Sequence, residues 1–204
     1  MAKKLGKVEK PAAEKFEKGR KLFLLPLVFA PDDPDAEFNK VLADYWQEAK
    51  EQINKLEEGM TRVSKVYHEL ISLSGDEGMK AIDEMDAGSK PIVKGCLEKG
   101  AAFYPVEDRR LMTEFIDWSR CLSVGLFSRN ALEIVDKEYN EVQQKRQDNI
   151  VKIIDETLKG DEVGMLVARE ELEIQFPQDV EVFRIAPPSL DKIKNWFREH
   201  GYAP

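Results

Sequence analysis

The stretch VGMLVA, residues 163–168, is an uninterrupted apolar run between Glu162 and Arg169. A strand with one face in water alternates apolar and polar side chains, whereas a strand covered on both faces does not. The run therefore predicts an interior strand of a parallel sheet that helices cover on both faces. We expect Met165 and Val167, which lie on one side of that strand, to be buried.

Four further segments have the composition of strands. Residues 22–30, LFLLPLVFA, form a second continuous apolar run. Pro26 removes a backbone N–H from this run, so we expect the strand to lie near a sheet edge or to carry a bulge. Residues 66–71 predict a strand, with a helical continuation as the alternative, and residues 101–106 and 180–185 predict two more.

Helical periodicity separates these strands along the chain. Predicted helices cover residues 35–59, 77–85, 89–98, 108–124 and 128–159, and a last amphipathic helix follows Ser189. Strands that alternate with helices in this order predict an α/β fold, with a mostly parallel sheet of about five strands covered by helices.

The helix predicted over residues 128–159 is long for a globular protein. It would span about 45 Å at 1.5 Å per residue, whereas a domain of this size has a radius of gyration of about 17 Å. We therefore expect it to extend beyond the core, leaving apolar side chains partly uncovered, and we expect a homodimer in which these helices pair. The side chains concerned are Leu132, Val135, Tyr139 and Val142.

Composition limits the class of protein. The chain has 204 residues, 42% of them hydrophobic, and a formal charge of −8, which favours one folded domain over residues 21–204 after a charged tail at residues 1–20. The acidic balance argues against a nucleic-acid partner. No apolar run is long enough for a membrane helix, and no signal peptide is recognised. Two cysteines make a disulfide framework implausible, so we expect a cytoplasmic protein.

Sequence motifs for common cofactors are absent. The chain contains no GxGxxG, no GxxxxGK[ST], no haem-attachment motif and no HExxH. It has only two histidines, His68 and His200, and no Cys/His cluster with zinc spacing. A site of oxygen ligands for Mg²⁺ or Mn²⁺ is the metal site that remains open.

Candidate site residues follow the predicted strands, because ligands of open α/β sheets bind outside the carboxyl ends of the strands. We expect Glu69, Glu107 and Arg169 to meet there, together with Arg146 from the polar interruption of the long helix. His68 is a further candidate for catalysis. Asp32, Asp33 and Arg110 also follow strands, and Glu69, Glu107 and Glu170 form the candidate metal set.

The segment of residues 140–186 resembles the end of TraB-like and erythromycin-esterase-like domains. In those domains an arginine-bearing helix precedes a buried strand that a Gly-His pair follows. Here Arg146 and Asn149 lie on the helix before the strand at residues 163–167, but Arg169 and Glu170 stand where the Gly-His pair would be. The resemblance implies the fold, and it does not carry over a hydrolase mechanism that needs that histidine.

Two classes of function follow. The first is a binding or regulatory module for a small ligand or a partner, which the lack of a nucleophile motif and the scarcity of histidine favour. The alternative is a hydrolase, either metal-assisted or acid/base, in which Glu69, Glu107, Glu170 and His68 act while Arg146 or Arg169 holds an anionic group.

Overall fold

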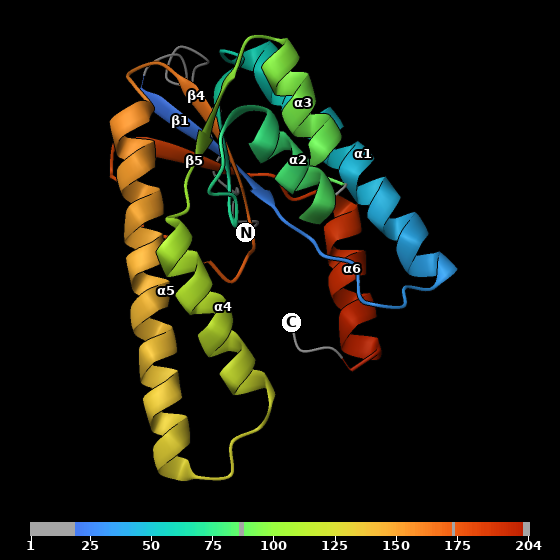
Figure 1. Cartoon of the computed structure of the whole chain (residues 1–204). Helices are drawn as coiled ribbons and strands as arrows, with labels where there is room; N and C mark the ends of the chain where they lie inside the picture. The colour runs from blue at the N-terminus through green and yellow to red at the C-terminus, as the bar shows by residue number, and fades with distance from the viewer. Residues whose placement is uncertain (1–18, 86–87, 173, 202–204) are drawn as a thin grey trace, which may run out of the picture.

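Five parallel strands form the central sheet, which confirms the predicted α/β class (Figure 1). The computed structural model describes residues 19–85, 88–172 and 174–201, so the predicted tail lies outside the described residues except for its last two. The strand order is β3-β2-β4-β1-β5, with the bounds β1 Arg20–Pro26, β2 Val63–His68, β3 Ala102–Pro105, β4 Val163–Ala168 and β5 Val180–Arg184.

Six helices lie in the described residues, close to their predicted positions. They are α1 Ala36–Gly59, α2 Gly75–Met85, α3 Lys90–Glu98, α4 Arg109–Ser123, α5 Arg129–Thr157 and α6 Pro188–Glu199. The starts of the long helices are set by side-chain caps: Asp35, Asp108 and Ser128 each accept a backbone N–H of the first turn. No helix of the described residues is long and apolar enough to cross a membrane.

The two faces of the sheet bury different helices. Phe23, Leu25, Met165 and Val167 face a core made with α1, α2, α3 and α6, which we call the first face. Leu22, Tyr67 and Leu166 point the other way and pack against Ile150 and Ile154 of α5 on the second face. Met165, Leu166 and Val167 are completely buried in the central strand β4, as the sequence predicts.

β1 lies near a sheet edge, as the sequence predicts from Pro26: it is the neighbour of the edge strand β5, and it pairs in regular register with β4. The N–H of Leu27 donates to Ala168 of β4, so the neighbouring position 26 turns toward β5. Pairing with β5 already ends at Leu24, so the missing N–H of Pro26 breaks no bond of the sheet. The expected strand at residues 66–71 forms three residues earlier, as β2, and an irregularity lies between its residues Val63 and Lys65.

The connections between strands change face beside β4. Those after β1 and β2 run through helices on the first face. Those after β3 and β4 run over the second face, through α4 and α5 and through the segment that packs Leu172. Because β4 lies between β2 and β1, the sheet has switch points on both sides of β4, where open α/β sheets bind ligands.

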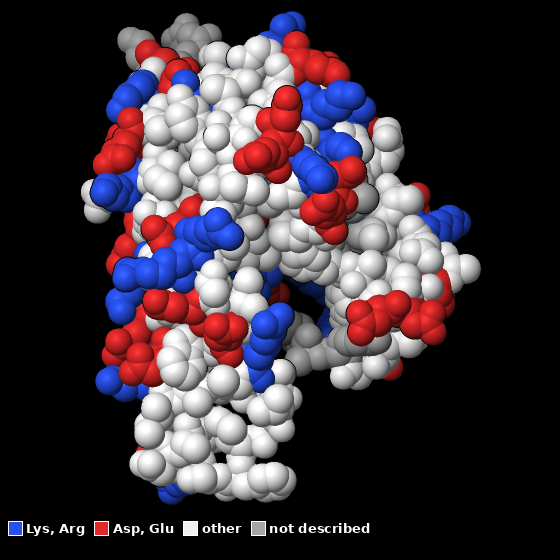
Figure 2. Space-filling view, in the orientation of Figure 1, with Lys and Arg blue, Asp and Glu red and all other residues white. Residues whose placement is uncertain are grey.

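Helices α4 and α5 form an antiparallel hairpin, and its end extends away from the sheet (Figure 1). This extension is the predicted one, but α4 covers part of the face that we expected to be free. Val142 is buried, Val135 and Tyr139 are half-buried, and Leu132 is exposed. The end of the hairpin shows mainly uncharged side chains in Figure 2.

Candidate functional site

Four predicted charged residues meet where the hairpin joins the sheet. Glu69 and Arg169 follow β2 and β4 directly, Glu107 lies two residues after β3, and Arg146 reaches them from α5. We call these four residues the charged network. The side chains of Arg146, Glu69 and Glu107 are completely buried, and that of Arg169 is 26% exposed.

Hydrogen bonds join all four side chains. Arg146 donates to both oxygens of Glu107, through Nε at 3.1 Å and through Nη2, and its Nη2 lies 3.3 Å from Oε1 of Glu69. Arg169 donates to Oε1 of Glu69 through Nη2 at 2.7 Å and Nε at 3.1 Å, and its backbone N–H donates to Oε2 at 2.8 Å. The N–H of Leu70 also donates to Glu107, at 3.1 Å. Every carboxylate oxygen of the network is therefore occupied.

The electrostatics of the network are balanced. Two guanidinium groups face two carboxylates, so the formal charges cancel. Burial lowers the pKa of Arg169, but the hydrogen bond and the charge of Glu69 outweigh it, and the pKa lies above its ordinary value. Both guanidinium groups also lie over the ring of Phe115, at 4.1 Å for Arg146 and 5.4 Å for Arg169, measured from Cζ to the ring centroid. The network thus joins three strands to both helices of the hairpin.

Two polar atoms inside the hairpin lack hydrogen-bond partners among the described residues. They are Nη1 of Arg146 and Oε1 of Gln143, both buried and one helical turn apart on α5. One atom is a donor and the other an acceptor.

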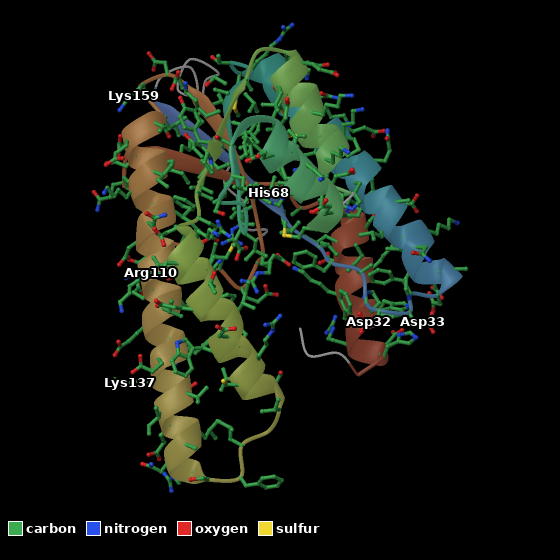
Figure 3. The ribbon with its side chains drawn as sticks, viewed as in Figure 1. Asp32, Asp33, His68, Arg110, Lys137 and Lys159 are labelled. Atoms are coloured by element: carbon green, nitrogen blue, oxygen red, sulfur yellow. The ribbon has the colours of Figure 1, made fainter. Side chains whose placement is uncertain are left out.

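His68 is not part of the charged network. It is completely buried, with Nδ1 donating to the backbone oxygen of Glu69 at 2.7 Å and Nε2 lying 3.1 Å from Oγ of Ser89. Val66 and His68 are two residues apart in β2 and point to the first face, whereas α5 and Arg146 cover the second. Figure 3 shows His68 within the body of the molecule, far from Asp32 and Asp33 in the loop before α1. Arg110, which also follows a predicted strand, lies on the exposed side of α4.

The predicted metal set does not assemble. Glu170 turns toward α6, where Lys194 binds its carboxylate at 2.8 Å. The carboxylates of Glu69 and Glu107 are held by arginines instead. Across the described part of the chain, no group of three His, Cys, Asp or Glu side chains could hold a metal ion.

A crevice beside the charged network is the feature that sequence reasoning missed. It has a volume of about 670 Å³ and lies between the carboxyl ends of β1 and β4 and helix α6. Figure 2 shows the surface hollowed between the hairpin and the region of α6. Apolar side chains form most of the crevice and charged ones stand beside them: Pro26, Leu27, Val28, Leu190, Ile193 and Phe197, with Glu170, Glu171, Lys194 and Arg198. The spacing of Leu190, Ile193 and Phe197 on one helical face was the available signal, but it is also the signal of an ordinary core.

Comparisons with protein-family models, with curated proteins and with solved structures found no match. The resemblance to TraB-like domains therefore stays a prediction.

Proposed function

We propose that this protein is a binding module for a small, largely apolar molecule, and that the crevice is its binding site. One observation carries the proposal: a mainly apolar cavity of about 670 Å³ lies at the carboxyl ends of two neighbouring strands. Small-molecule sites are typically of about 300–1,000 Å³ and mostly apolar. The connections after β1 and β4 leave toward opposite faces, which is where such folds bind ligands.

The charged network supports binding better than catalysis. A general base must reach a proton of its substrate or of a water molecule. The carboxylates of Glu69 and Glu107 are completely buried, and both oxygens of each accept hydrogen bonds from the protein. An acid/base or metal-assisted hydrolase would need these groups to be free. The network instead fixes the hairpin to the ends of the strands.

The experiment compares two tryptophan substitutions and uses Nile red, a neutral apolar dye. Val28→Trp places a large side chain at the crevice, whereas Leu73→Trp places the same side chain at an exposed position outside the crevice and the hairpin. We expect Val28→Trp to weaken dye binding at least tenfold and Leu73→Trp to leave it unchanged. Equal binding by all three folded proteins would refute the proposal. Lys194→Trp, on the half-buried rim, is the second variant if Val28→Trp fails to fold.

We also propose that the chain forms a homodimer through the end of the hairpin. Of the seven exposed large apolar side chains in the described residues, five lie there: Ile116, Val124, Phe127, Leu132 and Ile134. Monomers rarely expose such a concentration of apolar surface. Asp117, Arg120, Arg129 and Glu133 supply equal numbers of both charges beside it, which suits a two-fold contact between identical surfaces.

Light scattering tests the homodimer. We expect a mass of twice the 23.4 kDa of the chain. Phe127→Asp should return the mass to that of one chain, because Phe127 is fully exposed and its replacement affects only association. Leu73→Asp, at an exposed apolar residue outside the hairpin, is the control. A wild-type mass of one chain would refute the homodimer.

A cytoplasmic location is also part of the proposal. Cys96 and Cys121 are both free, and Cys96 is buried. Free thiols persist in reducing compartments, which supports the cytoplasm.

A further inference from the structure

A second, smaller cavity adjoins the crevice at the carboxyl edge of the sheet. It has a volume of about 30 Å³, and we call it the head cavity. It lies at the ends of β4, β1 and β5, and it shares Pro26, Glu170 and Leu190 with the crevice. The two spaces are therefore neighbours, one large and one small, and the small one has charged side chains beside its apolar ones. The remaining residues of the head cavity are Leu24, Ala168, Arg169, Arg184, Ile185 and Ala186.

The charged side chains of the head cavity leave one positive charge without a counterion. The guanidinium of Arg169 binds Glu69, and the carboxylate of Glu170 binds Lys194. Arg184, at the end of β5, is exposed, and the ion pairs found in the described residues do not include it. A ligand group placed here would thus meet an unpaired guanidinium, which binds carboxylates with two parallel hydrogen bonds.

We infer that the ligand of the crevice is a carboxylic acid with an apolar body, and that the head cavity receives its carboxylate beside Arg184. This inference rests on the proposed function, because it assigns a chemical class to the ligand of the same site. The head cavity is small, at about 30 Å³. A carboxylate is planar and has two oxygens, whereas a phosphate monoester ends in a tetrahedral group with three terminal oxygens, so the carboxylate suits this space better. The apolar body lies along Leu190, Ile193 and Phe197 of α6.

The test uses four probes with the same eight-carbon chain: octanoate, 1-octanol, octylamine and octyl phosphate. Two-dimensional ¹H–¹⁵N NMR titrations of the full chain give both the affinity and the position of binding. We expect octanoate to shift resonances of α6 and to bind about tenfold tighter than octylamine, as charged hydrogen bonds of this strength allow. Arg184→Gln should abolish this preference. Arg110→Gln, which removes an exposed arginine near the start of α4, should preserve it.

The outcomes separate the ligand class from the proposed function. If octanoate, octanol and octylamine shift the resonances of α6 with equal affinity, the assignment of the ligand as a carboxylic acid is wrong, and the crevice remains a binding site. If octyl phosphate binds tighter than octanoate, the assignment to carboxylates is overturned in favour of phosphates. If no probe shifts α6, the proposed function fails and the ligand class fails with it. A preference for octanoate that survives Arg184→Gln would remove Arg184 from the site.

Discussion

Arg146 is a completely buried arginine whose charge two buried carboxylates balance. Moving such ions out of water costs several kcal/mol for each ion, and the attraction between them does little more than offset this cost. The main energetic consequence is therefore asymmetric. Intact, the network adds little net stability, but removing one member leaves an uncompensated charge in the interior.

We expect Arg146→Met to lower the free energy of unfolding by about 3–5 kcal/mol, because Glu107 would keep its charge without its guanidinium partner. Urea denaturation followed by circular dichroism measures this change. Arg110→Met, which removes an exposed arginine of α4, should change the free energy by less than about 0.5 kcal/mol. Adding Glu107→Gln to Arg146→Met should restore part of the loss, since the two sites are in direct contact.

The four members of the charged network could be predicted from the sequence, but two further candidate residues, His68 and Glu170, do not belong to it. Arg146 could be predicted because it interrupts the apolar face of a long helix, and Glu69 because it follows a strand. His68 and Glu170 come directly before Glu69 and after Arg169 in the chain, yet they point away from the network. At the end of a strand, the direction of each side chain depends on the path of the following loop. Tertiary contacts determine that path, so the sequence pattern alone does not predict it.

Helices α1 and α6 are joined by one carboxylate. Glu48 of α1 accepts hydrogen bonds from the backbone N–H of Ser189 at 3.0 Å and from its hydroxyl, at the start of α6. These bonds favour the charged carboxylate and place the pKa of Glu48 below its ordinary value. A folded-state pKa below the unfolded one adds stability that is present above the unfolded pKa, and is lost as pH falls through the folded one.

We therefore expect part of the acid lability of this protein to come from Glu48. Unfolding free energies measured from pH 6 downward should decrease below pH ~4.3, the ordinary value of a glutamate. Glu48→Gln should make this decrease shallower, because its amide has no carboxyl to protonate. Glu51→Gln, at an exposed glutamate of the same helix, should leave the decrease unchanged. Identical pH profiles for the wild type and Glu48→Gln would contradict this assignment.

Two helical glycines should respond oppositely to alanine. Alanine usually stabilises a helix interior, by about 0.5–1 kcal/mol relative to glycine. Gly95 of α3 has open space where a Cβ would be, so we expect Gly95→Ala to raise the free energy of unfolding by that amount. At Gly78 of α2, a Cβ would lie 2.4 Å from the backbone oxygen of Leu73 and 2.9 Å from the ring of Phe103. Gly78→Ala should therefore lower the free energy of unfolding by about 1–3 kcal/mol.

Thermal unfolding of the two single variants measures both effects under the same conditions. Equal stability of Gly78→Ala and Gly95→Ala would show that α2 does not pack as closely against Leu73 as the structure indicates. The sequence alone could not separate these two positions. Both glycines lie inside predicted helices, and only the packing of α2 distinguishes them.

At the scale of the whole molecule, the order of helices and strands along the chain could be predicted, but which of them lie side by side in space could not. Apolar runs and helical periodicity decide which segments are strands and which are helices. Whether Pro26 breaks a hydrogen bond of the sheet depends on the last residue at which β1 pairs with β5, and the crevice depends on where α6 packs. Such features arise from pairing between segments that lie far apart along the chain, which local patterns do not record.

The hairpin divides α5 into two parts with different environments. Ile150 and Ile154 are completely buried against the second face of the sheet, whereas residues 129–134 lie at the end of the hairpin with Leu132 and Ile134 exposed. Local opening requires little free energy where few apolar contacts hold a segment. Stability along this one helix should therefore increase from its first residue toward its last turns.

We expect hydrogen exchange to follow this gradient, with the amides of residues 146–156 exchanging much more slowly than those of residues 133–138. Native-state exchange followed by NMR measures both sets in one experiment. The Phe127→Asp variant is the protein to use, because association of the hairpin ends would otherwise protect the faster set. The interior strand β4 supplies the internal reference, since its residues are buried on both faces and should open only with global unfolding. Uniform protection along α5, equal to that of β4, would show instead that the hairpin and the sheet unfold as a single cooperative unit.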